Sequence, residues 1–179
     1  LNKIYLINPI IRKEIYYSKK NKKKEINNTK KILIIGGSQG AKYFDKNITE
    51  VILKLSKIMN IEICQQIFNI KEKYLIEQKY IDAGIKHNLF DFDDQLFNKI
   101  SDYDLAISRS GASAIAELAF LNIPFVAIPF PFAKDDHQYF NAKFYESFNS
   151  CWLIRQENLD INNFVDLIAH LFTEKKEYF

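Results

Sequence analysis

Cysteine is scarce in this chain of 179 residues, which has only Cys64 and Cys151. A disulfide scaffold needs several cysteines, and a structural zinc site needs closely spaced ligand pairs. Neither pattern is present, and the three histidines (His87, His137 and His170) lie in unrelated segments. We therefore expect two buried free thiols, a reducing compartment and no bound metal.

Long apolar runs are missing as well. No run approaches the ~18–20 residues that span a bilayer, and no segment has the pattern of a signal peptide. Hydrophobic residues still make up 47% of the chain and charged residues 26%. This composition fits one globular domain with a substantial core. The first residue, Leu1 in place of Met, is what a piece of a longer protein would show.

A uniformly basic face is also lacking, although the net charge is +3. Seven lysines and one glutamate between residues 19 and 31 contribute +6, and subtracting this from +3 leaves −3 for the remaining residues. The charge distribution therefore argues against nucleic-acid binding. We interpret residues 19–31 as a solvated linker or loop, with contact to anionic lipid headgroups as the alternative.

Short apolar runs alternate with longer amphipathic stretches along the rest of the chain. Strands are predicted at 30–37, 61–67, 88–92, 104–108, 124–128 and 151–154. Helices are predicted at 41–59, 71–83, 95–101, 112–121, 138–148 and 161–172. The alternation predicts an α/β fold with a doubly wound, Rossmann-like parallel sheet over residues 32–179. Residues 1–18, with one strand and a turn at Asn8-Pro9, are interpreted as the end of an interdomain segment.

The first of four loops at the predicted carboxyl ends of strands is Gly36-Gly37-Ser38-Gln39-Gly40. Its glycines allow a tight turn, and the following helix presents free N–H groups to a phosphate. It is neither a Walker A loop nor a G-x-G-x-x-G motif. A glycine-rich turn without a ligand is the alternative.

The second loop, residues 108–113, also opens a helix and offers another anion site. Glu117 follows one turn later, where an acidic residue can accept hydrogen bonds from ribose hydroxyls. The alternative, a solvated helix residue, is weakened by its apolar neighbours. Two roles are open for Arg109: pairing with a phosphate, or bracing the loop.

The third and fourth loops add polar and aromatic residues. In residues 129–138, His137 and Gln138 are candidates for hydrogen bonds to sugar hydroxyls, although a capping or surface role is the default for the histidine. In residues 90–96, Phe92 and Leu96 are placed to wall a base, with an N-capped helix as the alternative. No nucleophile elbow supports a Ser/His/Asp triad.

In this order the loops resemble the C-terminal half of the MurG family of glycosyltransferases. The matching stretches are NPIIRKEI, ILIIGGSQGA, FDDQL, DLAISRSGASAIAELA and IPFVAIPFPFAKDDHQYFNA. The resemblance implies a GT-B enzyme of two Rossmann-like domains, acting at the cytoplasmic face of the plasma membrane as a peripheral protein. The implied inverting reaction needs no metal or cofactor. It moves N-acetylglucosamine (GlcNAc) from UDP-GlcNAc to undecaprenyl-diphospho-MurNAc-pentapeptide (lipid I to lipid II) in peptidoglycan synthesis.

The resemblance also implies a set of residues that bind UDP-GlcNAc. They are Arg12, Gly37, Ser38, Gln39, Gly40, Asp93, Leu96, Arg109, Gly111, Ala112, Ser113, Glu117, His137 and Gln138. In this scheme the glycine loop and Ser38 meet the diphosphate, and Arg12 lies near it. Glu117 holds the ribose, and the backbone at Asp93 with Leu96 frames the uracil. The remaining contacts to the sugar are those of Ala112, His137 and Gln138.

Several features depart from the family pattern. Asp93 stands where an aliphatic residue is usual, which matters less if only its backbone contacts the uracil. The motif G-N-P-[VI]-R appears as Ile7-Asn8-Pro9-Ile10-Ile11-Arg12, without its glycine and with one extra residue. The acceptor domain, which carries the candidate general base, is not in this chain, so we expect an incomplete half without activity of its own. The alternatives are a UDP-sugar-binding module without catalysis and a related GT-B transferase with another UDP-sugar donor.

Overall fold

The computed structural model describes residues 9–18, 28–37, 42–93, 96 and 100–173. Its strands are β1 (Lys30–Ile35), β2 (Ile61–Gln66), β3 (Lys86–Phe90), β4 (Leu105–Ser108), β5 (Phe125–Ala127) and β6 (Cys151–Leu153). Its α-helices are α1 (Lys13–Ser18), α3 (Thr49–Leu55), α4 (Ile70–Asp82), α5 (Ala112–Phe120), α6 (His137–Glu146) and α7 (Ile161–Thr173). Shorter helical turns are η1 (Phe44–Ile48), η3 (Ile100–Asp102), η4 (Lys134–Asp136) and η5 (Gln156–Asn158).

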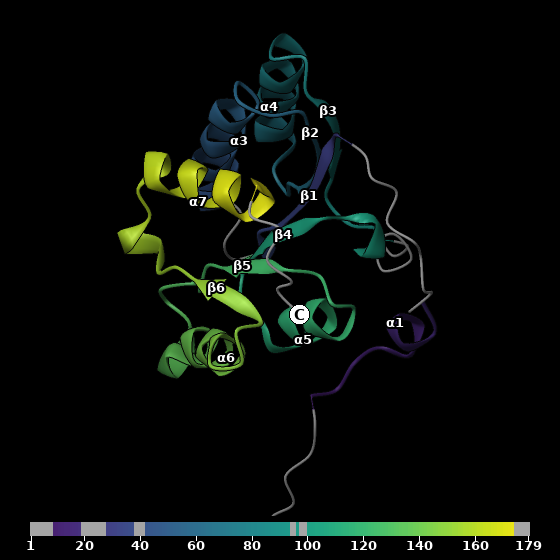
Figure 1. Ribbon diagram of the computed structural model, residues 1–179, viewed down its shortest axis with the longest axis vertical. Helices are drawn as coiled ribbons and strands as arrows, with labels where there is room; N and C mark the ends of the chain where they lie inside the picture. Colours follow the sequence, from purple (N-terminus) through teal and green to yellow (C-terminus); the bar gives the residue numbers. More distant parts are fainter. Residues whose placement is uncertain (1–8, 19–27, 38–41, 94–95, 97–99, 174–179) are drawn as a thin grey trace, which may run out of the picture.

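The six strands form one sheet in the order β3-β2-β1-β4-β5-β6, and every pair is parallel. The helices lie on both faces: α3, α4 and α7 on one, and α1, α5 and α6 on the other (Figure 1). The predicted doubly wound, Rossmann-like fold is therefore confirmed. The strand order reverses direction between β1 and β4, and such a switch point opens a crevice at the carboxyl edge of the sheet.

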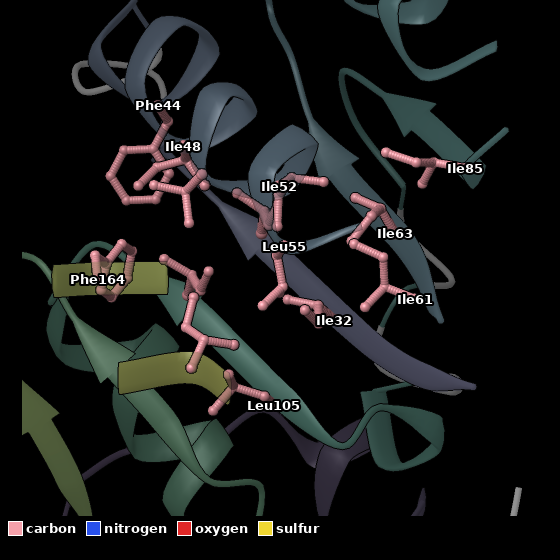
Figure 2. Close-up of a cluster of buried hydrophobic side chains, with 14 of the residues drawn as sticks. Ile32, Phe44, Ile48, Ile52, Leu55, Ile61, Ile63, Ile85, Leu105 and Phe164 are labelled. Carbon is pink, nitrogen blue, oxygen red and sulfur yellow. The ribbon is translucent and has the colours of Figure 1, made fainter. Parts of the chain in front are cut away.

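Alternating residues of the buried strands supply two separate cores, one on each face of the sheet. Ile32 and Ile34 of β1 belong to the first core, and Leu33 between them belongs to the second. Figure 2 shows the first core, in which side chains of η1 and α3 pack on β1 beside Phe164 of α7. The two faces are thus both sealed by apolar packing, which leaves the edges of the sheet for ligands.

Most predicted elements are present with shifted ends, and three expectations were wrong in detail. The strand predicted to 37 ends at Ile35, because Gly37 adopts a positive φ of 62°. The helix predicted at 41–59 contains a π-helical turn, η1, and ends as α3 at Leu55. In place of the helix predicted at 95–101, the described residues show 3-10 geometry at Leu96 and in η3.

The segment before the lysine run contains a short helix that the pattern did not predict. This helix, α1, buries Ile15 fully in the second core, and Tyr16 stacks on Phe120 of α5 with ring centroids 5.4 Å apart. The strand and turn expected near residues 3–9 and the lysines of 19–24 fall on or beside residues outside the described ranges. Residues 13–18 are thus packed against α5, directly after Arg12.

Cys64 and Cys151 are free and buried, as predicted. Burial raises the pKa of the Cys151 thiol to about 12, so this thiol stays protonated at neutral pH. Within the described part of the chain, no helix is both long and apolar enough to cross a membrane.

Candidate functional site

The fold brings three of the four predicted loops together at the carboxyl edge of the sheet. Ile35 of β1 is in register with Ser108 of β4, and Ser108 is in register with Ala127 of β5. The backbone N–H of Arg109 donates to the carbonyl of Ile35 at 3.0 Å, just where each strand ends. The start of the glycine turn, the loop before α5 and the loop before α6 therefore lie side by side at the switch point.

The glycine turn begins with a conformation that favours glycine. Gly37 has a φ of +62°, in the left-handed region, although no atom within 4 Å would contact an added Cβ. Its N–H donates to Oε1 of Gln66 at 3.3 Å. Backbone conformation, rather than lack of space, therefore explains a glycine here. Ser38, Gln39 and Gly40 lie outside the described residues.

Gln66 connects the glycine turn to the loop after β3. Its Nε2 donates to the carbonyl of Asp91 at 3.1 Å, while its Oε1 accepts from Gly37. Asp93 and Leu96 follow in the same loop, where Leu96 N–H donates to the Asp93 carbonyl at 3.3 Å. This loop leaves the sheet two strands away from β1. Sequence reasoning missed Gln66; the signal was a polar residue ending an otherwise mostly apolar strand.

The N-terminus of α5 lies just after β4 at the switch point and has no side-chain cap. Its N-cap, Gly111, has extended backbone, and Ala112 and Ser113 are exposed in the first turn. The Oγ of Ser110 is fully buried and has no hydrogen-bond partner among the residues that the structure describes. The Ser110 carbonyl accepts from Nδ2 of Asn141 at 3.1 Å, a contact from α6 that the sequence did not indicate. An uncapped helix N-terminus is suited to binding an anion.

Glu117, one turn further along α5, carries a buried carboxylate that pairs with Arg12. The Arg12 Nε lies 2.6 Å from Oε1 and Nη2 lies 2.5 Å from Oε2. The Glu117 side chain is 4% exposed and that of Arg12 is 50% exposed. The hydrogen bond to Glu117 raises the pKa of Arg12, in spite of the opposing effect of burial. Glu117 is therefore not a solvated helix residue, and Arg12 covers its carboxylate.

Arg109 points inward, into the base of the loops. Its Nη1 donates to the carbonyls of Ile128 at 3.1 Å and Pro129 at 2.9 Å, and its Nη2 donates to Oε1 of Gln156 at 2.6 Å. Burial lowers the pKa of the guanidinium to about 10, which still leaves it charged at neutral pH. Of the two roles left open by the sequence, these contacts match the bracing of loops.

The third loop turns into α6 through two residues of left-handed backbone, Asp135 (φ 53°) and Asp136 (φ 51°). His137 follows as the first residue of α6, exposed, with Nδ1 2.8 Å from the Lys134 carbonyl. Gln138 is half-buried, and its Oε1 accepts from the N–H of Phe130 at 3.0 Å. The structure therefore places both predicted sugar contacts at the start of one helix, beside the loop that Arg109 holds.

The arrangement as a whole suits a ligand with a phosphate and a diol. The N-terminus of α5 supplies N–H donors, and the buried carboxylate of Glu117 supplies a paired acceptor. Among the described residues, no group of three or more His, Cys, Asp or Glu side chains is placed to hold a metal ion.

Comparison with protein families gives a match over residues 31–179 to the glycosyltransferase family 28 C-terminal domain. A relative from Pelagibacter ubique is 39% identical over 99% of this chain and 49% of its own length. A relative from Rickettsia canadensis is 33% identical over 98% of this chain and 50% of its own length. Both are named UDP-N-acetylglucosamine--N-acetylmuramyl-(pentapeptide) pyrophosphoryl-undecaprenol N-acetylglucosamine transferase. The chain thus spans about half the length of these curated relatives.

Solved structures share the fold. Acinetobacter baumannii MurG superimposes with a TM-score of 0.74 and 25% identity, over 89% of this chain and 44% of that one. ALG13 has a TM-score of 0.53 and 18% identity, over 86% of this chain and 88% of that one. The second likeness concerns the fold alone.

Proposed function

Because the chain belongs to the glycosyltransferase family 28 C-terminal domain family, we propose that it is the donor-binding half of an inverting GT-B N-acetylglucosaminyltransferase. Its donor is UDP-GlcNAc, and the acceptor is undecaprenyl-diphospho-MurNAc-pentapeptide, so that lipid I becomes lipid II. The names of the relatives support both substrates. The reaction belongs to peptidoglycan synthesis, at the cytoplasmic face of the plasma membrane.

The observation that carries the proposal is the buried carboxylate of Glu117, one turn from the uncapped start of α5. Two ribose hydroxyls can donate to its two oxygens in place of the Arg12 guanidinium. Arg12, half-exposed on the interdomain segment, is then free to move toward the diphosphate. In this proposal one ligand therefore exchanges an internal ion pair for two sets of charge-assisted hydrogen bonds.

The other predicted residues are assigned around this anchor. The glycine turn from Gly37, with Ser38, Gln39 and Gly40, and the α5 N-terminus at Gly111, Ala112 and Ser113 hold the diphosphate. The loop at Asp93 and Leu96 frames the uracil. His137 and Gln138, at the start of α6, hydrogen-bond the sugar.

In the proposed reaction, the acceptor hydroxyl attacks the anomeric carbon of the donor sugar, and UDP leaves. The bond between that carbon and the diphosphate oxygen breaks, so negative charge develops on the diphosphate. Helix N-terminal N–H groups and Arg12 stabilise that charge. The proposal assigns no metal or cofactor, and it places the general base in the acceptor domain.

The proposal is tested by calorimetric titration of the purified chain with UDP-GlcNAc in EDTA. UDP-glucose and UDP-N-acetylgalactosamine measure selectivity for the donor sugar. We expect Glu117→Ala to weaken binding by about 1–3 kcal/mol, since the ribose loses a charged acceptor. Glu62→Ala is the matched control, because Glu62 pairs with exposed Lys86 near the start of β2, at the opposite edge of the sheet. Equal affinities for the wild-type chain and Glu117→Ala, or no binding by a folded chain, would overturn the proposal.

A further inference from the structure

Arg109 is a charged side chain buried at the switch point, with 6% of its surface exposed. A buried guanidinium is unfavourable unless its N–H groups are hydrogen-bonded. The loops at the carboxyl edge of the sheet supply partners for it, and the pattern of those partners indicates what Arg109 does.

Arg109 contacts the chain on both sides of the glycine turn. Before the turn, its backbone N–H donates to the carbonyl of Ile35 at 3.0 Å. After the turn, the carbon of its guanidinium lies 4.8 Å from the ring centroid of Phe44 and 5.5 Å from that of Tyr43. Cations at these distances are attracted to the faces of aromatic rings. Arg109 therefore contacts both ends of the glycine turn and sets the distance between them.

The same guanidinium reaches the third loop and the chain after β6. Its bonds to the Ile128 and Pro129 carbonyls hold the end of β5, and its bond to Gln156 holds η5. The hydroxyl of Tyr43 donates to the carbonyl of Gln156 at 3.2 Å and so closes a ring of contacts. The residues that flank the glycine turn (Ile35, Tyr43 and Phe44), the β5 loop and η5 are thereby connected to one another.

We infer that Arg109 is a positioning residue for the diphosphate, acting through the β5 loop and the residues on either side of the glycine turn. This inference rests on the proposed function, since it concerns how the same site holds the phosphates of a nucleoside diphosphate. The charge of Arg109 contributes as well as its hydrogen bonds, because a cation beneath the switch point gives a positive potential where the phosphates bind. The uracil contacts lie in the loop after β3. The ribose acceptor Glu117 lies on α5, where its carboxylate pairs with Arg12 rather than with Arg109.

The test uses the full chain and compares uridine with UDP, with dissociation constants from NMR titrations. We expect Arg109→Met to weaken UDP binding about tenfold or more, and uridine binding by less than about twofold, because only the phosphates sense the turn and the charge. Arg109→Lys keeps the charge but not the fork of donors, so its loss for UDP is smaller than that of Arg109→Met. Arg155→Met is the matched control, since Arg155 stacks on Tyr139 and pairs with Asp136 away from the glycine turn.

A second measurement needs no ligand. The Thr49 N–H donates to the carbonyl of Phe44, so its amide exchange reports on the end of the turn that Arg109 holds. We expect faster exchange at Thr49 in Arg109→Met and no change in Arg155→Met. Should Arg109→Met fail to fold, Gln156→Leu removes one anchor and is expected to shift both measurements in the same direction by less.

The outcomes separate the two proposals. If the wild-type chain does not bind UDP, the proposed function fails, and exchange at Thr49 still decides whether Arg109 positions the turn. Equal losses for uridine and UDP, or unchanged UDP binding and exchange in a folded variant, would show that Arg109 only stabilises the fold.

Discussion

The guanidinium of Arg12 pairs side-on with the carboxylate of Glu117, across 105 residues of sequence. Arg12 is half-exposed and directly precedes α1, whereas Glu117 is buried on α5. The pair therefore links the segment that enters the domain to the residue that we propose as the ribose acceptor. It also means that a ligand at Glu117 has to displace a protein side chain.

Removing Arg12 should destabilise the chain, because it leaves a buried carboxylate without its cation. Since Arg12 is half-exposed, water compensates part of the loss, and we expect Arg12→Ala to lower the free energy of unfolding by about 1–2 kcal/mol. Urea unfolding at pH 7 measures this change. Lys86→Ala, which breaks the exposed pair with Glu62, serves as the control and should cost less than about 0.5 kcal/mol. Similar costs for the two variants would contradict a special role for the Arg12 pair.

Gly37 and Gly111 form a matched pair for testing backbone strain. Neither has an atom within 4 Å of an added Cβ, but Gly37 has a φ of +62° and Gly111 has a φ of −61°. We expect Gly37→Ala to destabilise the chain by about 1–2 kcal/mol, whereas Gly111→Ala costs about 0.5 kcal/mol. Thermal or urea unfolding of both variants distinguishes them, and equal costs would show that the positive φ is not what selects glycine at position 37.

Asp45 of η1 should make stability depend on pH. Its side chain is buried, and neither carboxylate oxygen has a hydrogen-bond partner among the described residues. Burial, with a smaller contribution from Glu72, raises its pKa from 3.8 to about 7. The folded chain thus keeps a proton that the unfolded chain releases near pH 4, so its stabilising contribution is complete below that pH and is lost as the pH rises through 7.

The variant Asp45→Asn removes this dependence. We expect it to be more stable than the wild-type chain by about 1–3 kcal/mol at pH 8 and to differ little at pH 4. Urea unfolding at the two pH values gives both differences. The control is Asp166→Asn, at an exposed position on α7, which should leave the free energy of unfolding unchanged at both pH values. A pH-independent effect of Asp45→Asn would contradict the raised pKa.

Tyr80 of α4 and Gln65 of β2 form a buried hydrogen bond between the helix and the sheet. The Tyr80 hydroxyl donates to Oε1 of Gln65 at 2.5 Å, and Nε2 of Gln65 donates to Thr49 at 3.3 Å. Tyr80→Phe leaves the Gln65 oxygen buried without this donor, so we expect a loss of about 1–3 kcal/mol in unfolding free energy. Tyr74→Phe on the exposed side of the same helix is the comparison and should change stability by less than about 0.5 kcal/mol. If the two variants are equally stable, the hydrogen bond contributes nothing.

Much of the fold followed from local pattern. Apolar runs separated by glycine, proline and polar loops marked all six strands to within about two residues. The signal was clearest for β1, β4 and β5, since buried parallel strands are mostly apolar along their length. The pattern failed at η1, at Leu96 and at η3, where apolar spacing is compatible with α, π or 3-10 turns and tertiary packing selects among them. It also failed at α1, whose six residues are too few to show a period.

The sequence by itself determined that polar loops would gather at one edge of a parallel sheet, since the carboxyl ends of parallel strands share an edge. It did not determine which side chains would meet there. The tertiary structure decided that Arg12 lies on Glu117, that Arg109 turns inward to Ile128 and Pro129, and that Gln66 links two loops. These contacts join residues far apart in the chain, and local periodicity carries no information about them. They form only when strand pairing has placed the loops and burial has made an unpaired charge or polar group unfavourable.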